Sequence, residues 1–385
     1  MALPGFKDYL PFGRPDFGEQ EIAAVTRVLR SRWIGMGPET AAFERELAAA
    51  VGAPHVVTVN SCTSALFLAL KVQGIGPGDE VIVPSLTWCS TANAALYCGA
   101  RPVFCDIDPD TLCLTPTTVQ AWLTRKTKAV MVVHFGGYTV DVAALRRVLP
   151  ERVHIIEDAA HALGGAYPGG RPAGSSGNLV CFSFYPNKNL ATAEGGAVAQ
   201  YDDDVADRLR SLRQHALPIT AWKRFIHPRS LLLSEQLEEL GFKMNFTDLQ
   251  AAIARVQLRR QPELARRRLT IAQAYVERLG NLRPPLRFQE RVCAPDHARH
   301  LFTIQLPTGR GSSSRNRLLL ALRARNIGAT IHYAPLHRMP LYGQRSRALP
   351  VTEQVCRRIM TLPISASMSS RAASRVADHL LDLLG

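Results

Sequence analysis

Short apolar runs alternate with amphipathic stretches through the first 160 residues of the chain. The runs at 56–59, 80–83, 101–105, 129–133 and 153–156 are rich in β-branched residues, and stretches of helical pattern at 65–72, 87–98, 119–123 and 142–149 follow the first four. Continuously apolar strands separated by helices are typical of a parallel sheet that is covered on both faces. We therefore predict an α/β domain whose ligand-binding residues follow the carboxyl ends of the strands.

The pattern changes near residue 250. It predicts helices at 248–256 and 263–279, interrupted by Pro262, and then a strand at 300–306, a helix at 312–325, a strand at 327–333 and a helix from about Ser370. This order indicates a second, smaller α+β unit. We place the boundary so that residues 1–250 form a large ligand-binding domain and residues 251–385 form a small C-terminal domain.

The composition of the 385 residues is that of an ordinary globular protein, with 46% hydrophobic and 20% charged residues. No apolar run approaches the roughly 18 residues of a membrane helix, and residues 1–8 lack the order of a signal peptide. The eight cysteines include no CxxC pair and mostly have apolar neighbours. We expect a cytoplasmic protein with reduced cysteines, without a metal site and without membrane contact.

The chain carries 46 Lys and Arg residues against 32 Asp and Glu, a formal charge of +14. Such an excess favours anionic partners, although a basic host proteome or solvated helix faces explain it equally well. The arginines are not interleaved with aromatic residues, and no zinc-finger or RNP-type motif is present. Nucleic acid is therefore not expected as a partner, and a basic nucleic-acid-binding regulator is kept only as a remote alternative.

Two charged residues follow predicted strands in the first domain. Asp158 ends the apolar run at 153–156, where a buried carboxylate needs a cation or several hydrogen-bond donors. The alternative is that Asp158 caps a helix beginning at Ala159. Lys188 follows a strand-like run and precedes Gly195 and Gly196. A desolvated lysine can form a Schiff base with an aldehyde, whereas an isolated loop lysine is usually solvated.

Two further segments supply groups that suit an aromatic phosphate ester. The run Ser61-Cys62-Thr63-Ser64 lies between a strand and a helix, where hydroxyls and backbone N–H groups can hold a phosphate. Simple capping of that helix by Ser61 or Thr63 explains the same run. Trp88 follows the next strand and can stack on a flat ring, or can be part of the core.

A phosphate, a ring nitrogen that needs an anion, a flat face and an aldehyde are combined in pyridoxal 5′-phosphate (PLP). On these residues the chain resembles the DegT/DnrJ/EryC1/StrS family of PLP-dependent sugar aminotransferases. The resemblance implies the aspartate aminotransferase (type I) fold, with a mostly parallel-sheet PLP-binding domain. Its motifs, from about residue 11 to the C-terminus, are Trp33-Ile34-Gly35-Met36-Gly37-Pro38 with Phe43-Glu44, Ser61-Cys62-Thr63-Ser64-Ala65-Leu66, Gly78-Asp79-Glu80-Val81-Ile82-Val83-Pro84, Glu157-Asp158-Ala159-Ala160-His161, Phe182-Ser183-Phe184 with Lys188-Asn189, Glu194-Gly195-Gly196 and Thr247-Asp248-Leu249-Gln250-Ala251-Ala252.

The resemblance implies a role for each residue of the cofactor site. Lys188 forms the Schiff base and then moves the proton between cofactor and substrate carbons. Asp158 pairs with the protonated pyridine nitrogen, Trp88 stacks on the ring, and His161 lies near the phenolic oxygen of the ring. The phosphate is held by Cys62, Thr63 and Ser183. The family pattern has Gly where this chain has Cys62, which bears on how closely the backbone approaches the phosphate.

The segment Lys243-Met244-Asn245 resembles the branch of the family that acts on UDP-4-keto sugars. In that branch the asparagine reaches the cofactor phosphate of the neighbouring subunit, which implies a homodimer with shared active sites. Lys243 then faces the nucleotide-sugar, unless it is simply solvated. The resemblance also makes Trp33, His332 and Tyr333 candidate substrate contacts. Without the resemblance, His332 is interpreted as a strand histidine whose hydrogen bonds are made within the protein.

The implied reaction is ping-pong transamination. L-Glutamate converts PLP to pyridoxamine 5′-phosphate (PMP), and a nucleotide-diphosphate keto-sugar, expected to be a UDP-sugar, then takes the amino group. Some relatives are sugar dehydratases in which histidine replaces the lysine, and Lys188 argues against that alternative. The sequence leaves open the base, the ring size, the position of the keto group and the stereochemistry of the amine.

Overall fold

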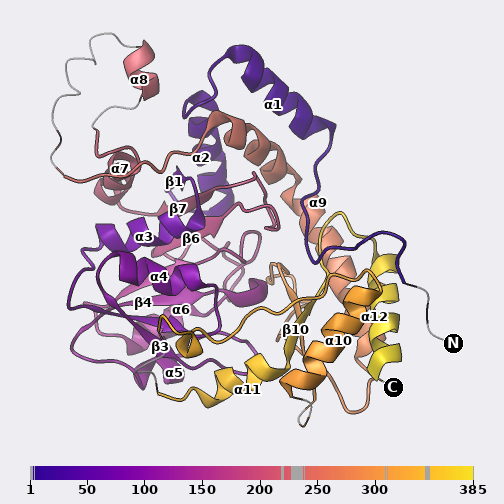
Figure 1. Cartoon of the computed structure of the whole chain (residues 1–385). Helices are drawn as coiled ribbons and strands as arrows, with labels where there is room; N and C mark the ends of the chain where they lie inside the picture. Colours follow the sequence, from indigo (N-terminus) through magenta and orange to yellow (C-terminus); the bar gives the residue numbers. More distant parts are fainter. Residues whose placement is uncertain are drawn as a thin grey trace.

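The structure, a computed structural model, describes residues 3, 5–217, 221–226, 237, 239–307, 309, 311–342 and 347–384. Its larger part is built on a seven-stranded sheet with the order β1-β7-β6-β5-β4-β2-β3 (Figure 1). In chain order the strands are β1 (His55–Val59), β2 (Glu80–Pro84), β3 (Arg101–Cys105), β4 (Thr127–Val133), β5 (His154–Asp158), β6 (Leu179–Ser183) and β7 (Gly196–Gln200).

All strands of this sheet except β7 run in the same direction. β7 is antiparallel to both of its neighbours, β1 and β6, whereas β2 to β6 pair in parallel. The carboxyl ends of β1, β2, β4, β5 and β6 therefore meet at one edge. Registers pair Asp158 with Val133 on one side and with Cys181 on the other, so this carboxylate lies in the middle of that edge.

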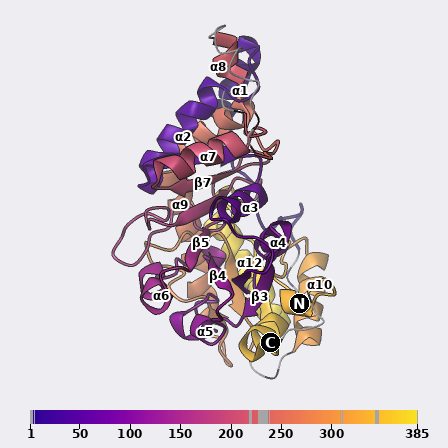
Figure 2. The ribbon, with the colours of Figure 1, turned by 90° about the vertical axis from the view of Figure 1, so that its left-hand side faces the viewer.

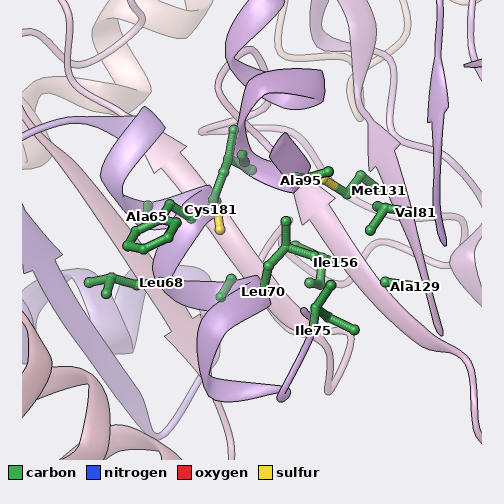
Figure 3. Close-up of a cluster of buried hydrophobic side chains, with 14 of the residues drawn as sticks. Ala65, Leu68, Leu70, Ile75, Val81, Ala95, Ala129, Met131, Ile156 and Cys181 are labelled. Carbon is green, nitrogen blue, oxygen red and sulfur yellow. The ribbon is translucent and has the colours of Figure 1, made fainter. Parts of the chain in front are cut away.

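Helices cover both faces of the sheet. Along β2, Val81 and Val83 belong to the hydrophobic cluster under α3 and α4, and Ile82 belongs to the cluster under α5 and α6. Figure 3 shows the first cluster between α3 and the strands. This two-sided burial explains why the strands are continuously apolar. The helices in this part are α1 (Glu19–Ser31), α2 (Pro38–Val51), α3 (Cys62–Val72), α4 (Cys89–Tyr97), α5 (Pro116–Gln120), α6 (Val142–Val148), α7 (Asp203–Leu212) and α8 (Ala221–Ile226), with a 3-10 turn, η1 (Phe135–Gly137).

The C-terminal part is built on a three-stranded antiparallel sheet with the order β10-β9-β8. The N-terminal segment joins this part: Phe6 N–H donates to the carbonyl of Arg325, and Leu10 forms a parallel bridge with Ile327. Figure 2 shows α10 and α12 at the end of the molecule opposite to α1 and α8. The elements are α9 (Asp248–Leu279), β8 (Arg287–Phe288), β9 (Phe302–Gln305), α10 (Ser312–Ala324), η3 (Leu336–Arg338), α11 (Pro350–Arg358), β10 (Ile359–Leu362) and α12 (Ser370–Leu384).

Helix α9 connects the two parts without a break. The sequence predicted an interruption at Pro262, and this was wrong, because one helix of 32 residues contains the proline. The first half of α9 packs on α1 and α2, and the second half packs on α12. Packing at both ends holds the helix together despite the N–H that proline lacks. The predicted domain boundary at residue 250 lies in the first turn of α9 and stays a prediction.

The predicted strand at 327–333 was also wrong. This segment makes only isolated bridges, from Ile327 to Leu10 and from Thr330 to Thr361. Ile327 and Ala329 are buried in the hydrophobic cluster formed with α10, α12, β9 and β10, which explains why the segment is apolar although no ladder forms.

The described part of the chain holds no helix long and apolar enough to cross a membrane. All eight cysteines are free thiols. Among the same residues, no group of three or more His, Cys, Asp or Glu side chains is arranged to hold a metal ion.

Asp248 fixes the start of α2 from the first turn of α9. The buried carboxylate accepts hydrogen bonds from the N–H groups of Gly37 at 2.8 Å and Thr40 at 2.9 Å, and from the Thr40 hydroxyl at 2.7 Å. It therefore satisfies N–H groups that a helix leaves free in its first turn, and it offsets the helix dipole.

We expect Asp248→Ala to lower the free energy of unfolding by about 2–4 kcal/mol, because buried donors lose their acceptor. Urea unfolding followed by circular dichroism measures the change. Asp204→Ala, at an exposed position in the first turn of α7, is the matched control. Equal unfolding midpoints for the two variants would contradict this role of Asp248.

Candidate active site

One cavity of 490 Å³ lies at the carboxyl edge of the large sheet. It is lined by most of the predicted site residues, namely Cys62, Thr63, Trp88, Asp158, His161, Ser183, Lys188, His332 and Tyr333. The strands deliver the polar groups directly, because β5 ends at Asp158 and β6 ends at Ser183. The last two lining residues come from the C-terminal part, so the cavity lies between the two parts of the molecule.

Asp158 is the buried anion of this cavity. Its carboxylate accepts hydrogen bonds from the Thr91 hydroxyl at 2.8 Å and from the Ala160 N–H at 3.2 Å. Burial raises its pKa above the ordinary value for an aspartate. The alternative helix cap is not realised, because turns and not a helix follow the residue. Among the described residues no Lys, Arg or His forms an ion pair with it, so the carboxylate is left for a group in the cavity.

The carboxylate of the neighbouring acid, Glu157, receives its hydrogen bonds from side chains inside the protein. Its carboxylate accepts hydrogen bonds from His134 Nε2 at 2.8 Å, from Tyr167 at 2.6 Å and from Asn178 at 2.8 Å. Burial opposes ionisation of Glu157, but these hydrogen bonds hold its pKa below the usual value. Successive side chains of a strand point to opposite faces. Glu157 is thus part of the structure, and Asp158 alone is available to a ligand.

Lys188 carries an amine of reduced basicity. Burial lowers its pKa to about 8, even though negative charge at Cys62 or Asp158 would oppose the shift. Nζ lies 3.4 Å from Nε2 of His300. No carboxylate forms an ion pair with Lys188 among the described residues. The residue is half-buried and lines the cavity, so it is not the solvated loop lysine of the alternative interpretation.

His161 is held in one tautomer. Its Nδ1 accepts a hydrogen bond from the N–H of Gly136 at 3.3 Å, which assigns the ring proton to Nε2. Nε2 then donates to the hydroxyl of Tyr333, 3.4 Å away. Burial, followed by the charge of Lys188, lowers the pKa of His161 well below its usual value. The ring is therefore a neutral hydrogen-bond donor.

The N-terminus of α3 forms the second polar end of the cavity. Ser61 is the N-cap and accepts from the N–H of Ser64 at 3.1 Å, so the capping interpretation holds for Ser61. The next N–H groups, of Cys62 and Thr63, have no acceptor within the helix. A Cβ on Gly196 would lie 2.6 Å from the backbone nitrogen of Cys62, so glycine is needed where β7 meets α3. Free donors and a helix dipole at this point suit a phosphate.

Aromatic and histidine side chains form the remaining wall. Trp88 is 61% exposed, which excludes the core interpretation, and its ring lies 5.7 Å from that of Tyr333. His332 does not belong to a strand; its Nδ1 lies 2.9 Å from the Thr361 hydroxyl, and burial lowers its pKa to about 3. Phe12 lines the cavity beside His332, with ring centroids 5.2 Å apart.

Three predicted residues do not line this cavity. Trp33 donates from Nε1 to the carbonyl of Met36 at 3.4 Å, and Asn245 Nδ2 donates to the sulfur of Met36 at 3.6 Å. Lys243 is exposed and pairs with Gln214 in an isolated bridge. Trp33 and Asn245 thus meet at Met36, just before α2, whereas Lys243 lies beside the end of α7, and all three are outside the cavity of their own chain.

The sequence analysis missed Phe12, Thr91 and His300, which the structure brings to the site. The sequence could have indicated Thr91, because it lies one helical turn after Trp88 in the helix that follows β2. Phe12 and His300 had none, since their positions depend on contacts with distant segments. His300 had been assigned to a strand, which in the structure begins at Phe302.

The residues present fit PLP. The cavity volume lies within the usual range for small-molecule sites, about 300–1,000 Å³. It offers an unpaired buried carboxylate, an amine of lowered pKa and free helix N–H groups. These are the partners of a pyridine nitrogen, an aldehyde and a phosphate.

Comparison with known proteins agrees with this geometry. Residues 15–381 match the DegT/DnrJ/EryC1/StrS aminotransferase family. The chain belongs to the DegT/DnrJ/EryC1/StrS aminotransferase family. It is 40% identical, over 98% of this chain and 97% of the relative, to the spore coat polysaccharide biosynthesis protein SpsC of Bacillus subtilis.

Solved structures confirm the predicted fold of this family member. Spr1654 from Streptococcus pneumoniae in its PMP form superposes with a TM-score of 0.90 at 30% identity, covering 97% of this chain and 98% of that chain. DesI in the presence of its TDP-sugar product superposes with a TM-score of 0.86 at 30% identity, covering 99% and 94%. Spr1654 is also known in its PLP form. The predicted enzyme class, a PLP-dependent sugar aminotransferase, is confirmed by the family, and both predicted cofactor forms are seen in this relative.

The lowered pKa of Lys188 predicts its reactivity in the cofactor-free enzyme. Labelling by trinitrobenzenesulfonate requires a neutral amine, so the rate at Lys188 should be half-maximal near pH 8. Below that pH it should fall about tenfold per unit, whereas lysines in water titrate near about 10.4. Peptide mass spectrometry measures each site, and the exposed lysines are the internal reference. A midpoint at Lys188 equal to theirs would refute the prediction.

Proposed function

We propose that this aminotransferase moves the amino group of L-glutamate to a nucleotide-linked keto-sugar, with UDP as the expected carrier, in a ping-pong cycle of PLP and PMP. The observation that carries the proposal is that one cavity is lined by a carboxylate and an amine of opposite charge preference, Asp158 and Lys188. Among the residues that the structure describes, the buried carboxylate of Asp158 forms no ion pair with a cation, and the half-buried amine of Lys188 forms none with an anion. Keeping both unpaired is costly, and PLP satisfies both.

The chain's own residues divide the work around the cofactor. Asp158 stabilises a protonated ring nitrogen, which gives bound PLP its capacity to accept electrons from a substrate carbon. Cys62, Thr63 and Ser183 hold the phosphate at the end of the cavity next to α3. Lys188, once its amine is free, holds or releases the proton that moves between carbon atoms of the substrate. Its presence where the dehydratase relatives carry histidine supports transamination.

His161 and Trp88 orient the cofactor in this proposal. The neutral imidazole of His161 presents Nε2–H to the cavity and to Tyr333, so it can donate to an oxygen on the ring without bringing a positive charge. Trp88, exposed at the cavity wall, offers a flat face for stacking. His332 and Tyr333, from the C-terminal part, are placed to contact the sugar.

The formal charge of +14 supports a diphosphate-linked substrate, since arginine and lysine suit phosphate oxygens. The TDP-sugar product in DesI supports the same substrate class. A panel of UDP-, dTDP- and GDP-keto-sugars, with product mass as the readout, identifies the carrier.

We also propose a homodimer in which Trp33, Lys243 and Asn245 complete the site of the partner. Two observations support this arrangement. The three residues lie outside the cavity of their own chain, and Nδ2 of Asn245 donates to the sulfur of Met36 at 3.6 Å, which is a weak acceptor. An amide N–H held by so weak an acceptor can donate instead to a phosphate oxygen bound to a second copy.

L-Glutamate should bleach the visible absorption of the PLP-loaded enzyme and produce 2-oxoglutarate. Lys188→Ala should abolish both changes while its circular dichroism stays that of the wild type, because no other side chain replaces the amine. Stopped-flow spectroscopy and product mass measure the reaction. An unchanged spectrum of the wild type under saturating PLP and glutamate would refute transamination.

Asn245→Ala should weaken PLP retention by about 10- to 100-fold, because a hydrogen bond to a charged group contributes about 1.5–3 kcal/mol. Equilibrium dialysis measures PLP affinity, and light scattering measures the mass of the assembly. Asn281→Ala, at an exposed position, is the matched control. Wild-type PLP affinity in the dimeric variant would remove Asn245 from the site.

A further inference from the structure

His300 touches the reactive atom of the proposed site, although it does not line the cavity. Its Nε2 lies 3.4 Å from Nζ of Lys188, and its ring packs against that of His161 with centroids 4.3 Å apart. Only 3% of the residue is exposed. A histidine so close to a nucleophilic amine affects which protonation state of that amine is preferred.

The other ring nitrogen of His300 decides the direction of the hydrogen bond. Nδ1 is buried and has no hydrogen-bond partner among the described residues. If Nδ1 carried the proton, a buried N–H donor would have no acceptor. Leaving the lone pair of an unprotonated Nδ1 without a donor costs less free energy. The single proton of the neutral ring is therefore better placed on Nε2, facing Lys188.

A donor at Nε2 discriminates between the two forms of Lys188. An ammonium group has three N–H donors and no lone pair, so it cannot accept a hydrogen bond from Nε2–H. The neutral amine has one lone pair and can accept it. The contact between the two nitrogens is thus favourable only when Lys188 is unprotonated.

We propose that His300 is a catalytic residue that holds Lys188 as the neutral amine by donating a hydrogen bond from Nε2 to Nζ. The proton that the ammonium loses goes to solvent through the cavity, and His300 keeps its own proton throughout. The proposal rests on the proposed function, because it concerns the same lysine.

The surroundings of His300 keep its ring neutral. Burial is the largest influence on its pKa, which lies well below the usual value, and positive charge at Lys188, His161, Arg268 or His332 would lower it further. Among the described residues no carboxylate contacts the ring, so none stabilises an imidazolium. A neutral ring that carries one proton is the form that the hydrogen bond requires.

The test uses the cofactor-free enzyme and trinitrobenzenesulfonate, with labelling of Lys188 followed by peptide mass spectrometry. In His300→Phe the ring still packs on His161 but donates no hydrogen bond. We expect the labelling midpoint to rise by about one pH unit, since a hydrogen bond made only by the neutral form shifts the pKa by its net free energy. His300→Gln keeps an N–H donor, so its labelling midpoint should lie close to that of the wild type. His55→Phe, at a half-buried position at the start of β1 and so at the opposite edge of the sheet, is the control and should leave the midpoint unchanged.

An unchanged or lowered midpoint in His300→Phe would overturn the proposal. If this variant fails to fold, the wild type decides: ¹⁵N NMR of histidine-labelled, cofactor-free protein should show the Nε2–H tautomer for His300, and the Nδ1–H tautomer would overturn the proposal. Borohydride reduction of the PLP-loaded wild type tests the proposed function separately. PLP trapped on Lys188 with no midpoint shift in the Phe variant refutes the role of His300 alone, whereas PLP trapped elsewhere refutes the proposed function.

Discussion

The active site depends on a buried carboxylate that the protein itself does not neutralise. Asp158 and Glu157 are adjacent at the end of β5, and both are buried. Four side chains satisfy Glu157, whereas Asp158 receives one hydroxyl and one N–H and no cation from the described residues. Because an uncompensated buried charge is costly, a cationic group bound in the cavity would stabilise Asp158. The protonated ring nitrogen of PLP, as proposed above, would be such a group.

The direction of the strands places every other partner within reach of this carboxylate. β1, β5 and β6 run the same way, so the helix N-terminus after β1, Asp158 and Ser183 meet at one edge of the sheet. Lys188 follows β6 after a short loop. The antiparallel β7 between β1 and β6 brings Gly196 against the start of α3, where a larger residue would collide with the backbone. A site for a phosphate, a ring and an aldehyde thus follows from the topology.

What the sequence could predict is what depends on local pattern and on strand direction. The apolar runs identified β1 to β5, and the rule for the carboxyl ends of strands singled out Asp158 and Thr63 as ligand-binding residues. Contacts between distant segments could not be read in this way. Pro262 was expected to break a helix that packing at both ends keeps continuous. Residues 327–333 were expected to form a strand, although they make only isolated bridges and are buried against helices and strands of the C-terminal part. His300 reaches Lys188 across 112 positions of sequence, and no local signal marks it.

The cavity wall formed by Trp88 and Tyr333 depends on contacts between the two parts of the molecule. Ser85, at the end of β2, lies 2.6 Å from Nδ1 of His337, and Nε2 of His337 lies 3.1 Å from Glu353. The carbonyl of Ser85 also accepts from the N–H of Leu336 at 3.0 Å.

Trp88 follows Ser85 by three residues, and Tyr333 precedes His337 by four. This buried connection therefore fixes the segment that carries Trp88 against the segment that carries Tyr333, and their rings approach to 5.7 Å. The large sheet thus positions Asp158, Ser183 and the start of α3, while the attachment of the C-terminal part fixes the shape of the rest of the cavity.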